Sequence, residues 1–381
     1  MQPLPLAAMN IAVNTRFLLE QKMEGIGYFT KEVFHHLVLK YPQHNFYFLF
    51  DRPYSADFLF APNVHPLIVQ PPARHPLLWK IWFDLKIPRV LRKIKADVFI
   101  SPDGFCSLAT RVPQCIVVHD LGFLHHPGAY KRSHFHYLKF FTPRFLAKAG
   151  AVVTVSELSK HDILSHYPLP SEKIKVVYSA VKDIFKPLDF SGKTRLKEKF
   201  TDGREFFIYI GAIQPRKNLV NLLKAFSLFK KRQKSEMKLV LSGRLAWKNN
   251  EFSELLKTYK YREDVVLTGY LPEEELAELL AAAYAMVYPS LFEGFGVPVL
   301  EAMRSNVAVL TSKNSSMEEI GGEGALYFDP LDVQDMGDKL MLIYKDENLR
   351  SRLIEKGKEI EKKYSWERTG DLLWEAVEKL V

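Results

Sequence analysis

The sequence predicts an α/β protein made of two doubly wound domains, each a parallel sheet covered by helices on both faces. Three observations carry this prediction. The chain has 381 residues, more than a single hydrophobic core usually supports. Its apolar runs are continuous rather than alternating, as in strands that are buried on both faces. These runs form two series with helical stretches between them, and the polar segment 180–194, which lacks periodicity, separates the series.

Strands are expected where short runs of β-branched and aromatic residues occur. In the first series these runs cover residues 10–14, 46–50, 97–100, 115–118, 151–155 and 175–178. In the second they cover 206–210, 238–242, 265–267, 286–288, 307–311 and 325–328. Helices are expected between them, as at 219–229, where leucine and phenylalanine recur at i, i+3 and i+4. We therefore predict domains at 9–185 and 186–363, with the hinge in 180–194, and a closing capped helix at 364–381.

The composition limits the class of protein. Hydrophobic residues make up 47% of the chain, enough for packed interiors. The two cysteines, Cys106 and Cys115, have no metal-like spacing and predict a reducing, cytoplasmic compartment. No run of about 18 apolar residues occurs that could span a bilayer. The first eight residues, MQPLPLAA, lack the features of a signal peptide, so we expect a short disordered extension with the true start at Met9.

The net charge of +9 is carried by the first half of the chain. Residues 1–185 contain 22 Lys and Arg against 13 Asp and Glu, whereas residues 186–381 contain 31 of each. All 12 histidines precede residue 167. The first half is therefore expected to meet an anionic partner.

Two segments of the first half, 74–95 and 130–148, combine basic residues with aromatic ones, among them Trp79, Trp82 and Phe83. This composition suits the surface of an anionic membrane. The alternative is that the aromatics belong to the core and the cations to an ordinary solvated face. Nucleic acid could also use such a patch, but no recognition module is apparent. We expect peripheral association with the inner face of the cytoplasmic membrane and no nucleic-acid partner.

The stretch LFEGFGVPVLEAM (291–303) predicts a turn between a strand and a helix. Gly294 and Gly296 permit a tight turn, and the proline that follows is a good first residue of a helix. The start of such a helix presents N–H groups and a positive dipole end, which suit a diphosphate. Glu301 is expected in the first helical turn, where it could accept a pair of ribose hydroxyls, and Glu293 lies across the turn. Alternatively, Glu301 only complements the helix dipole.

A second motif, GAIQPRKN (211–218), follows the expected strand at 206–210 directly. Gly211 is followed by the cations Arg216 and Lys217, which suit phosphate oxygens. The pattern is not a Walker loop. A basic pair in a loop is usually a solvated surface feature, but this one is expected at the carboxyl end of a strand, in the same domain as the glutamate-containing turn.

The histidines allow two interpretations. His119 follows an expected strand and precedes Asp120, so it is either a hydrogen-bonded structural residue or part of a site. His125, His126, His134 and His136 could suggest a metal site. Because no Cys or carboxylate stands at ligand spacing from them, we expect a solvated or acceptor-facing surface and no metal.

Taken together, these motifs resemble the retaining GT-B glycosyltransferases of glycosyltransferase family 4 (group 1), and most closely the branch with mannosyltransferase activity. The resemblance covers almost the whole chain. The segments that carry it are GIGYFTKEV (25–33), VHDLGFL (118–124), TVSELSKHDI (154–163), TGYLPEEELAELLAAAYAMVYPSLFEGFGVPVLEAM (268–303) and SSMEEIGGEGALYFDPLDV (315–333). It implies two Rossmann-like domains that face each other across a cleft, the first for the acceptor and the second for the nucleotide-sugar donor. It also implies that the C-terminal helix crosses back to the first domain.

The resemblance implies roles for the second domain. Glu301 would hold the donor ribose, and Glu293 would contact hydroxyls of the transferred hexose. Arg216 and Lys217, in the loop that begins at Gly211, would neutralise the leaving diphosphate. The backbone amides of Phe295, Gly296 and Val297 would face the sugar and the diphosphate. Gly294, in the same turn, would also belong to the donor site.

In the first domain, Gly27 would allow a close approach of the chain to the diphosphate. His119 would lie at the anomeric side of the sugar, with Asp120 as an orienting group. The sequence departs from the family pattern at two places. Ala212 replaces an arginine that is common after the glycine of the phosphate loop, and Ser179-Ala180 replaces the usual Asn-Gly.

The residue types fit metal-free sugar transfer. Departure of a nucleoside diphosphate leaves negative charge, which prearranged donors can stabilise without a metal. No Asp-x-Asp motif for a divalent metal occurs in the sequence. We therefore expect no cofactor beyond the nucleotide-sugar. The resemblance to the mannosyltransferase branch implies GDP-mannose as the leading donor, with UDP-hexoses next. The expected acceptor is a cell-envelope glycan, such as lipopolysaccharide, or a lipid-linked saccharide.

Other functions stay open from the sequence. A nucleotide-sugar epimerase can share the architecture but needs no basic acceptor surface. In a dinucleotide-dependent oxidoreductase, the glycine motif should follow the first strand directly, whereas GIGYFT comes about ten residues later. A non-catalytic nucleotide-sugar-binding protein would bind the donor and tolerate the loss of Glu293.

Overall fold

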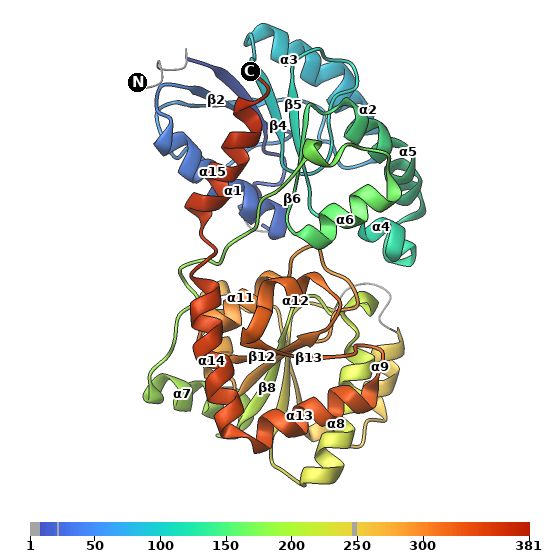
Figure 1. The fold of residues 1–381 in the computed structure, drawn as a ribbon, viewed down its shortest axis with the longest axis vertical. Coiled ribbons are helices and arrows are strands. Elements are labelled where there is room, and N and C mark those ends of the chain that lie inside the picture. The colour runs from blue at the N-terminus through green and yellow to red at the C-terminus, as the bar shows by residue number, and fades with distance from the viewer. Residues whose placement is uncertain (1–7, 21–22, 246–249) are drawn as a thin grey trace. The chain divides into compact units, whose positions relative to one another are not determined.

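The computed structural model describes residues 8–20, 23–245 and 250–381. The chain divides into two compact units, one of residues 1–179 with 365–381 and one of residues 180–364 (Figure 1). The second unit thus begins at the first residue of the segment 180–194, in which we expected the hinge, and helix α7 (Phe190–Thr201) takes up the end of that segment. The disordered extension expected at residues 1–8 lies outside the described residues, except for Ala8.

The first unit contains a seven-stranded parallel sheet with the strand order β3-β2-β1-β4-β5-β6-β7. The strands are β1 (Asn10–Asn14), β2 (Asn45–Phe50), β3 (Val64–Ile68), β4 (Val98–Ser101), β5 (Gln114–Val118), β6 (Ala151–Thr154) and β7 (Ile174–Val176). The helices are α1 (Gly25–Lys40), α2 (Pro76–Ile81), α3 (Ile87–Lys93), α4 (Gly122–His125), α5 (Arg132–Lys148), α6 (Glu157–His166) and, from the end of the chain, α15 (Trp366–Glu378).

The second unit contains a six-stranded parallel sheet with the order β10-β9-β8-β11-β12-β13. The strands are β8 (Phe206–Ile210), β9 (Lys238–Ser242), β10 (Val265–Gly269), β11 (Ala285–Tyr288), β12 (Ala308–Ser312) and β13 (Ala325–Phe328). The helices besides α7 are α8 (Leu219–Gln233), α9 (Asn250–Lys257), α10 (Glu273–Ala282), α11 (Val297–Arg304), α12 (Ser316–Gly321), α13 (Val333–Lys345) and α14 (Glu347–Glu361). Both units are therefore doubly wound α/β structures, as the continuous apolar strands predict.

Strand β3 was not expected from the sequence. Its residues, VHPLI, contain Pro66 in the middle, and a proline removes one donor from the hydrogen-bond ladder. The strand nevertheless forms because it lies at the edge of the sheet, where hydrogen-bond partners are needed on one side only. It pairs in parallel with β2, and Pro66 is in register with Phe48.

Helix α15 packs against α1 within the first unit (Figure 1). The indole of Trp374 is almost fully buried and stacks on the ring of Tyr41, with the ring centroids 4.3 Å apart. At the rim, the Asp371 carboxylate accepts from Lys40 Nζ at 2.5 Å and lies 2.9 Å from His36 Nε2. The amphipathic end of the chain thus belongs to the core of the first unit.

The aromatic residues of the segment 74–95 pack inside the protein, which corrects their expected place on a membrane surface. Trp82 and Phe83 are 0% and 1% exposed, and the indole Nε1 of Trp82 donates to the carbonyl of Val69. Trp79 is partly buried and donates to the carbonyl of Ala73. Among the described residues, no helix has the length and apolar character needed to cross a bilayer.

Candidate functional site

The candidate site of the second unit forms where strands β8 and β11 end. The two strands are parallel neighbours, so the loops that follow them lie at the same edge of the sheet. Gly211 follows β8 with φ of +141°, and a side chain there would place its Cβ 2.8 Å from the Tyr209 hydroxyl. Glycine is therefore needed where this loop turns. The Leu291 N–H donates to the carbonyl of Arg216 at 2.9 Å, which joins the two loops.

A compact charged cluster holds the loops together. Lys217 Nζ lies 2.5 Å from one carboxylate oxygen of Glu293 and donates to the Tyr288 hydroxyl at 2.6 Å. Arg216 Nη1 lies 3.0 Å from the other carboxylate oxygen and also donates to the carbonyl of Phe292. Lys217 is only 7% exposed. The sequence-predicted residues Arg216, Lys217 and Glu293 are thus brought together, whereas the contribution of Tyr288 as a hydrogen-bond partner was missed.

The electrostatics of this cluster keep Glu293 ionised. Burial acts to raise the pKa of the Glu293 carboxyl, but Lys217 and Arg216 outweigh it and hold the pKa below its ordinary value. Two cations and one carboxylate leave a net single positive charge. The cluster can therefore attract an anion while Glu293 remains a hydrogen-bond acceptor for hydroxyl groups.

The turn after the charged cluster contains the expected glycine, but Glu301 lies further along the following helix than we expected. Gly296 has φ of +102°, and a Cβ there would lie 2.8 Å from Met317 Cγ. Helix α11 begins at Val297, so Glu301 is its fifth residue and lies beyond the first turn, where we had expected it. The helix starts one residue before the proline because Pro298 is equally acceptable as the second helical residue. Complementing the helix dipole is therefore a weaker explanation for Glu301.

Glu301 has an environment unlike that of Glu293. Burial raises the pKa of Glu301 to about 7, with Lys182 opposing this shift and Glu273 adding to it. Lys182 Nζ and Glu273 Oε1 form an ion pair at 2.8 Å. Lys182 and Glu273 were not expected at the site from the sequence, and they come from the start of the second unit and from α10. The acidic run PEEEL at 272–276 was the only signal for them.

Of the turn residues expected at the donor site, Gly294 and Phe295 are buried. The Phe295 ring packs edge-on against that of Tyr364 with centroids 6.0 Å apart. Val297 opens α11. These residues are in place between the charged cluster and the helix, and their role toward a ligand stays a prediction.

In the first unit, His119 directly follows β5. Its Nε2 lies 2.8 Å from the carbonyl oxygen of Pro102, so Nε2 carries the proton and Nδ1 is left as an acceptor. Its ring packs edge-on against Phe29 at 5.2 Å. Burial lowers the pKa of His119, against the effect of the Pro102 carbonyl, which favours a neutral imidazole.

Asp120 does not orient His119 by a hydrogen bond. Its Oδ1 accepts from the Gly122 N–H at 2.7 Å and so closes the turn into α4. The two neighbouring side chains are held separately, His119 by the carbonyl of Pro102 and Asp120 by the turn. The sequence contained no signal for the carbonyl partner, because backbone acceptors are not visible in residue types.

Gly27 lies within α1 and is buried. A Cβ there would lie 2.5 Å from the carbonyl oxygen of Phe17 and 2.6 Å from Met23 Cγ. Glycine is thus required for the close approach of the helix to the preceding loop, a structural reason that stands beside the expected approach to a ligand.

The histidines expected on a solvated surface include one with a carboxylate partner. His125 Nε2 lies 2.9 Å from the carboxylate of Asp162, and His166 Nδ1 lies 3.2 Å from the same carboxylate. Potential ligand atoms of the three residues lie within 4.8 Å of one another. Asp162 and His166 are on α6, far from His125 in the sequence, so ligand spacing around His125 could not reveal them.

Comparisons with known proteins agree with this division of the chain. Residues 191–360 match the family model of glycosyl transferases group 1, and residues 25–183 match that of Glycosyltransferase Family 4. The O-antigen chain mannosyltransferase B of Escherichia coli is 29% identical over 300 residues, covering 77% of this chain and 78% of that protein. The O-antigen chain mannosyltransferase RfbU of Salmonella typhimurium is 29% identical over 276 residues, covering 71% and 72%.

Solved structures show the same fold. Anabaena HepE in complex with UDP and glucose superposes with a TM-score of 0.75 over 97% of this chain and 100% of that chain, at 14% identity. WaaG, a glycosyltransferase involved in lipopolysaccharide biosynthesis, gives a TM-score of 0.74 over 97% and 99%, also at 14% identity. At this identity the likeness concerns the fold.

Proposed function

The chain belongs to the GT-B glycosyltransferases that join a family 4 half to a group 1 half, and we propose that it transfers mannose from GDP-mannose with retention of anomeric configuration. The acceptor we propose is a glycan or a lipid-linked saccharide of the cell envelope. Support for the sugar comes from two relatives that cover more than two thirds of the chain and are both O-antigen mannosyltransferases.

The observation that carries the proposal is the cluster of Lys217, Arg216 and Glu293. Its net positive charge suits the diphosphate of a nucleotide-sugar, and its ionised carboxylate suits hydroxyls of the hexose. When the diphosphate leaves, the negative charge that develops would be stabilised by donors already in place. We therefore propose that the donor site needs no Mg²⁺ or Mn²⁺.

His119 is proposed to act at the sugar rather than on the nucleotide. A neutral imidazole fixed by the carbonyl of Pro102 presents Nδ1 as an acceptor of fixed direction. Such a group can accept from a sugar hydroxyl without adding a charge near the anomeric carbon. Glu301, whose pKa is raised to about 7, is proposed to receive the ribose hydroxyls.

Thermal unfolding of the full chain with GDP, UDP, ADP, dTDP or NAD, each with and without EDTA, tests the donor. A ligand that binds only the folded state raises the melting temperature by mass action. We expect a rise with GDP that EDTA does not alter, followed by mannosyl transfer from GDP-mannose in the same buffer. If only UDP raises the melting temperature, the donor is a UDP-sugar and not GDP-mannose. A melting temperature raised only by NAD, or a rise that EDTA abolishes, would contradict the proposed site.

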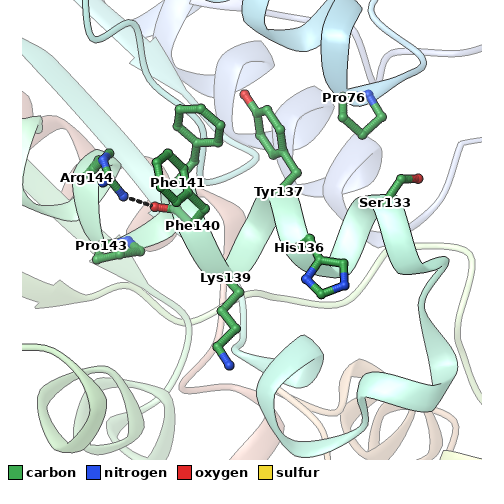
Figure 2. A pocket seen from close by; sticks show the side chains of 9 residues that line it. All are labelled: Pro76, Ser133, His136, Tyr137, Lys139, Phe140, Phe141, Pro143 and Arg144. Carbon is green, nitrogen blue, oxygen red and sulfur yellow. Dashed lines mark hydrogen bonds between the residues drawn. The ribbon is translucent and has the colours of Figure 1, made fainter.

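A second proposal concerns the location of the enzyme. Helix α5 lacks acidic residues and lines an open groove of about 790 Å³, which includes Lys139, Phe140 and Arg144 (Figure 2). Phe140 is 54% exposed, and the Arg144 guanidinium lies over its ring at 3.6 Å from the centroid. An exposed aromatic beside cations suits the interface of an anionic bilayer. We propose peripheral binding through α5 on the cytoplasmic face of the membrane.

Flotation with phosphatidylglycerol vesicles tests this surface. We expect binding that falls at 1 M NaCl, is weak with phosphatidylcholine, and decreases in Phe140→Ser. Leu39→Ser is the matched control, because Leu39 is 55% exposed on α1 of the same unit. Binding that is indifferent to salt and lipid charge, or an equal loss in both variants, would contradict the proposal.

A further inference from the structure

A separate cavity of about 380 Å³ lies within the first unit. Its charged and polar lining consists of Arg16, Arg52, Arg74 and His134, and its aromatic lining includes Trp79 and Phe105. None of these residues belongs to the candidate donor site.

The cavity lies at the edge of the sheet where ligands of parallel α/β structures bind. Arg16 follows β1, Arg52 follows β2, Arg74 follows β3, and Phe105 follows β4. These four strands are neighbours in the order β3-β2-β1-β4, so their carboxyl ends present the four residues together. Loops at the carboxyl ends of such strands are the usual position of a ligand site.

Two of the arginines are fixed by buried carboxylates. Arg16 Nε lies 2.6 Å from Asp103 Oδ2, and both side chains are at most 5% exposed. Arg52 makes a bidentate pair with Asp51, which is fully buried, with Nη2 at 2.8 Å from Oδ2. These pairs hold the guanidinium groups in position and compensate their charge.

Arg74 supplies the charge that is not compensated. It is exposed, and among the described residues its guanidinium makes no hydrogen bond or ion pair. Its backbone N–H donates to the carbonyl of Pro72, which fixes the start of the side chain. Arg52 lines the same cavity, and planar guanidinium groups are well suited to phosphate oxygens.

The aromatic side of the cavity is rigid. The indole of Trp79 is held by a 2.7 Å hydrogen bond to the carbonyl of Ala73, and its ring contacts those of Phe105 and His134 at centroid distances of 5.3 and 4.8 Å. The Arg16 guanidinium lies 4.6 Å from the Phe105 centroid. The cavity that Arg74 lines therefore also has an aromatic face on which a sugar ring or an apolar chain can pack.

We propose that this cavity binds a phosphate-bearing acceptor, with its phosphate at Arg74 and Arg52 and its adjoining group against Trp79. This inference rests on the proposed transferase function and deepens it, because it names the chemistry of the acceptor. A soluble sugar phosphate and a lipid-linked saccharide share that chemistry.

The test uses the full chain with the donor site saturated by GDP, so that phosphate probes cannot occupy that site. Binding is measured by calorimetry for three probes: N-acetylglucosamine 1-phosphate, N-acetylglucosamine linked to farnesyl diphosphate in detergent, and the phosphate-free methyl N-acetylglucosaminide. We expect at least one phosphorylated probe to bind and Arg74→Gln to weaken it roughly tenfold, the effect of losing one charge-assisted contact. The soluble probe binding alone identifies a sugar phosphate, and the lipid probe binding alone identifies a lipid-linked acceptor.

Arg111→Gln is the matched control, because Arg111 is an exposed arginine of the same unit outside the cavity. The proposal is overturned if neither phosphorylated probe binds, if the phosphate-free probe binds equally well, or if Arg74→Gln and Arg111→Gln behave alike. If GDP does not stabilise the protein, the proposed donor site in the second unit is contradicted. The phosphorylated probes can then be measured without GDP, so the acceptor cavity is still tested independently.

Discussion

The two units arrange their charged groups differently. In the second unit, the cations Lys217 and Arg216 share Glu293, and Lys217 is buried while Arg216 is partly buried. The first unit has 23 Lys and Arg against 16 Asp and Glu, together with all the histidines, and leaves cations such as Arg74 exposed. We infer that the two cations fixed by Glu293 suit a small ligand of defined structure, such as a nucleoside diphosphate. The cationic and aromatic surface of the first unit instead suits a larger acceptor.

The largest effect is expected when Lys217, a cation of the charged cluster, is removed. Lys217→Ala leaves Glu293 with Arg216 as its one cationic partner and removes one of the two cations that we propose bind the diphosphate. We expect transfer to fall about 10²- to 10³-fold, with weaker GDP binding. Lys224→Ala, an exposed lysine of the same unit, is the control for both measurements. Transfer by the Lys217 variant at the wild-type rate would remove this cluster from the mechanism.

A smaller effect with a different signature is expected in the first unit. His119→Ala should lower kcat about 10- to 100-fold, because it removes the acceptor that we propose for the sugar, and leave GDP affinity within about twofold of wild type. Steady-state transfer kinetics with calorimetry of GDP separate the two quantities. His161→Ala, an exposed histidine of the same unit, should change neither. An equal loss of GDP affinity and turnover would place His119 at the nucleotide.

The pH dependence of stability should distinguish the two glutamates of the second unit. The pKa of Glu301 is raised to about 7 from an ordinary value of about 4.5, so the folded state binds more protons between these values. The contribution of Glu301 to stability should then fall as pH rises from about 4.5 to 7. Glu293, whose pKa is lowered, contributes stability above its ordinary pKa that is lost as pH falls.

Melting temperatures between pH 5 and 8, without nucleotide, test this difference. Glu301→Gln should flatten the decline toward pH 7, since a neutral amide has no proton to lose. Glu293→Gln should instead lower the melting temperature most at the higher pH values. A decline of unchanged slope in Glu301→Gln would assign the titration to another group.

The smallest effect is expected at the rim of the first unit. Lys40→Ala removes an exposed ion pair with Asp371, and such pairs contribute about 0–1 kcal/mol. Trp374→Ala, in the adjacent buried contact, should cost about 3–5 kcal/mol. Urea unfolding that gave both variants the same midpoint would contradict the view that α15 is held by its apolar face.

The sequence predicted most of the fold because continuous apolar strands are a local signal. Strand β3 was missed since Pro66 is normally excluded from strands, and only its place at the sheet edge permits it. The site of the second unit was predictable where its residues belong to two short motifs. The neighbours of Glu301, Lys182 and Glu273, were not, because the fold brings them from distant segments. The aromatics of 74–95 show that composition does not reveal which side of a helix is buried.

The path of the chain through the two units has a consequence for biosynthesis. Helix α15 completes the first unit, yet it lies in the sequence after the whole of the second unit. On the ribosome, the first unit must therefore wait for residues 365–381 with the Tyr41 side of α1 uncovered, while the second unit can finish folding before it. Deletion of residues 365–381 should therefore damage the half of the protein that was made first.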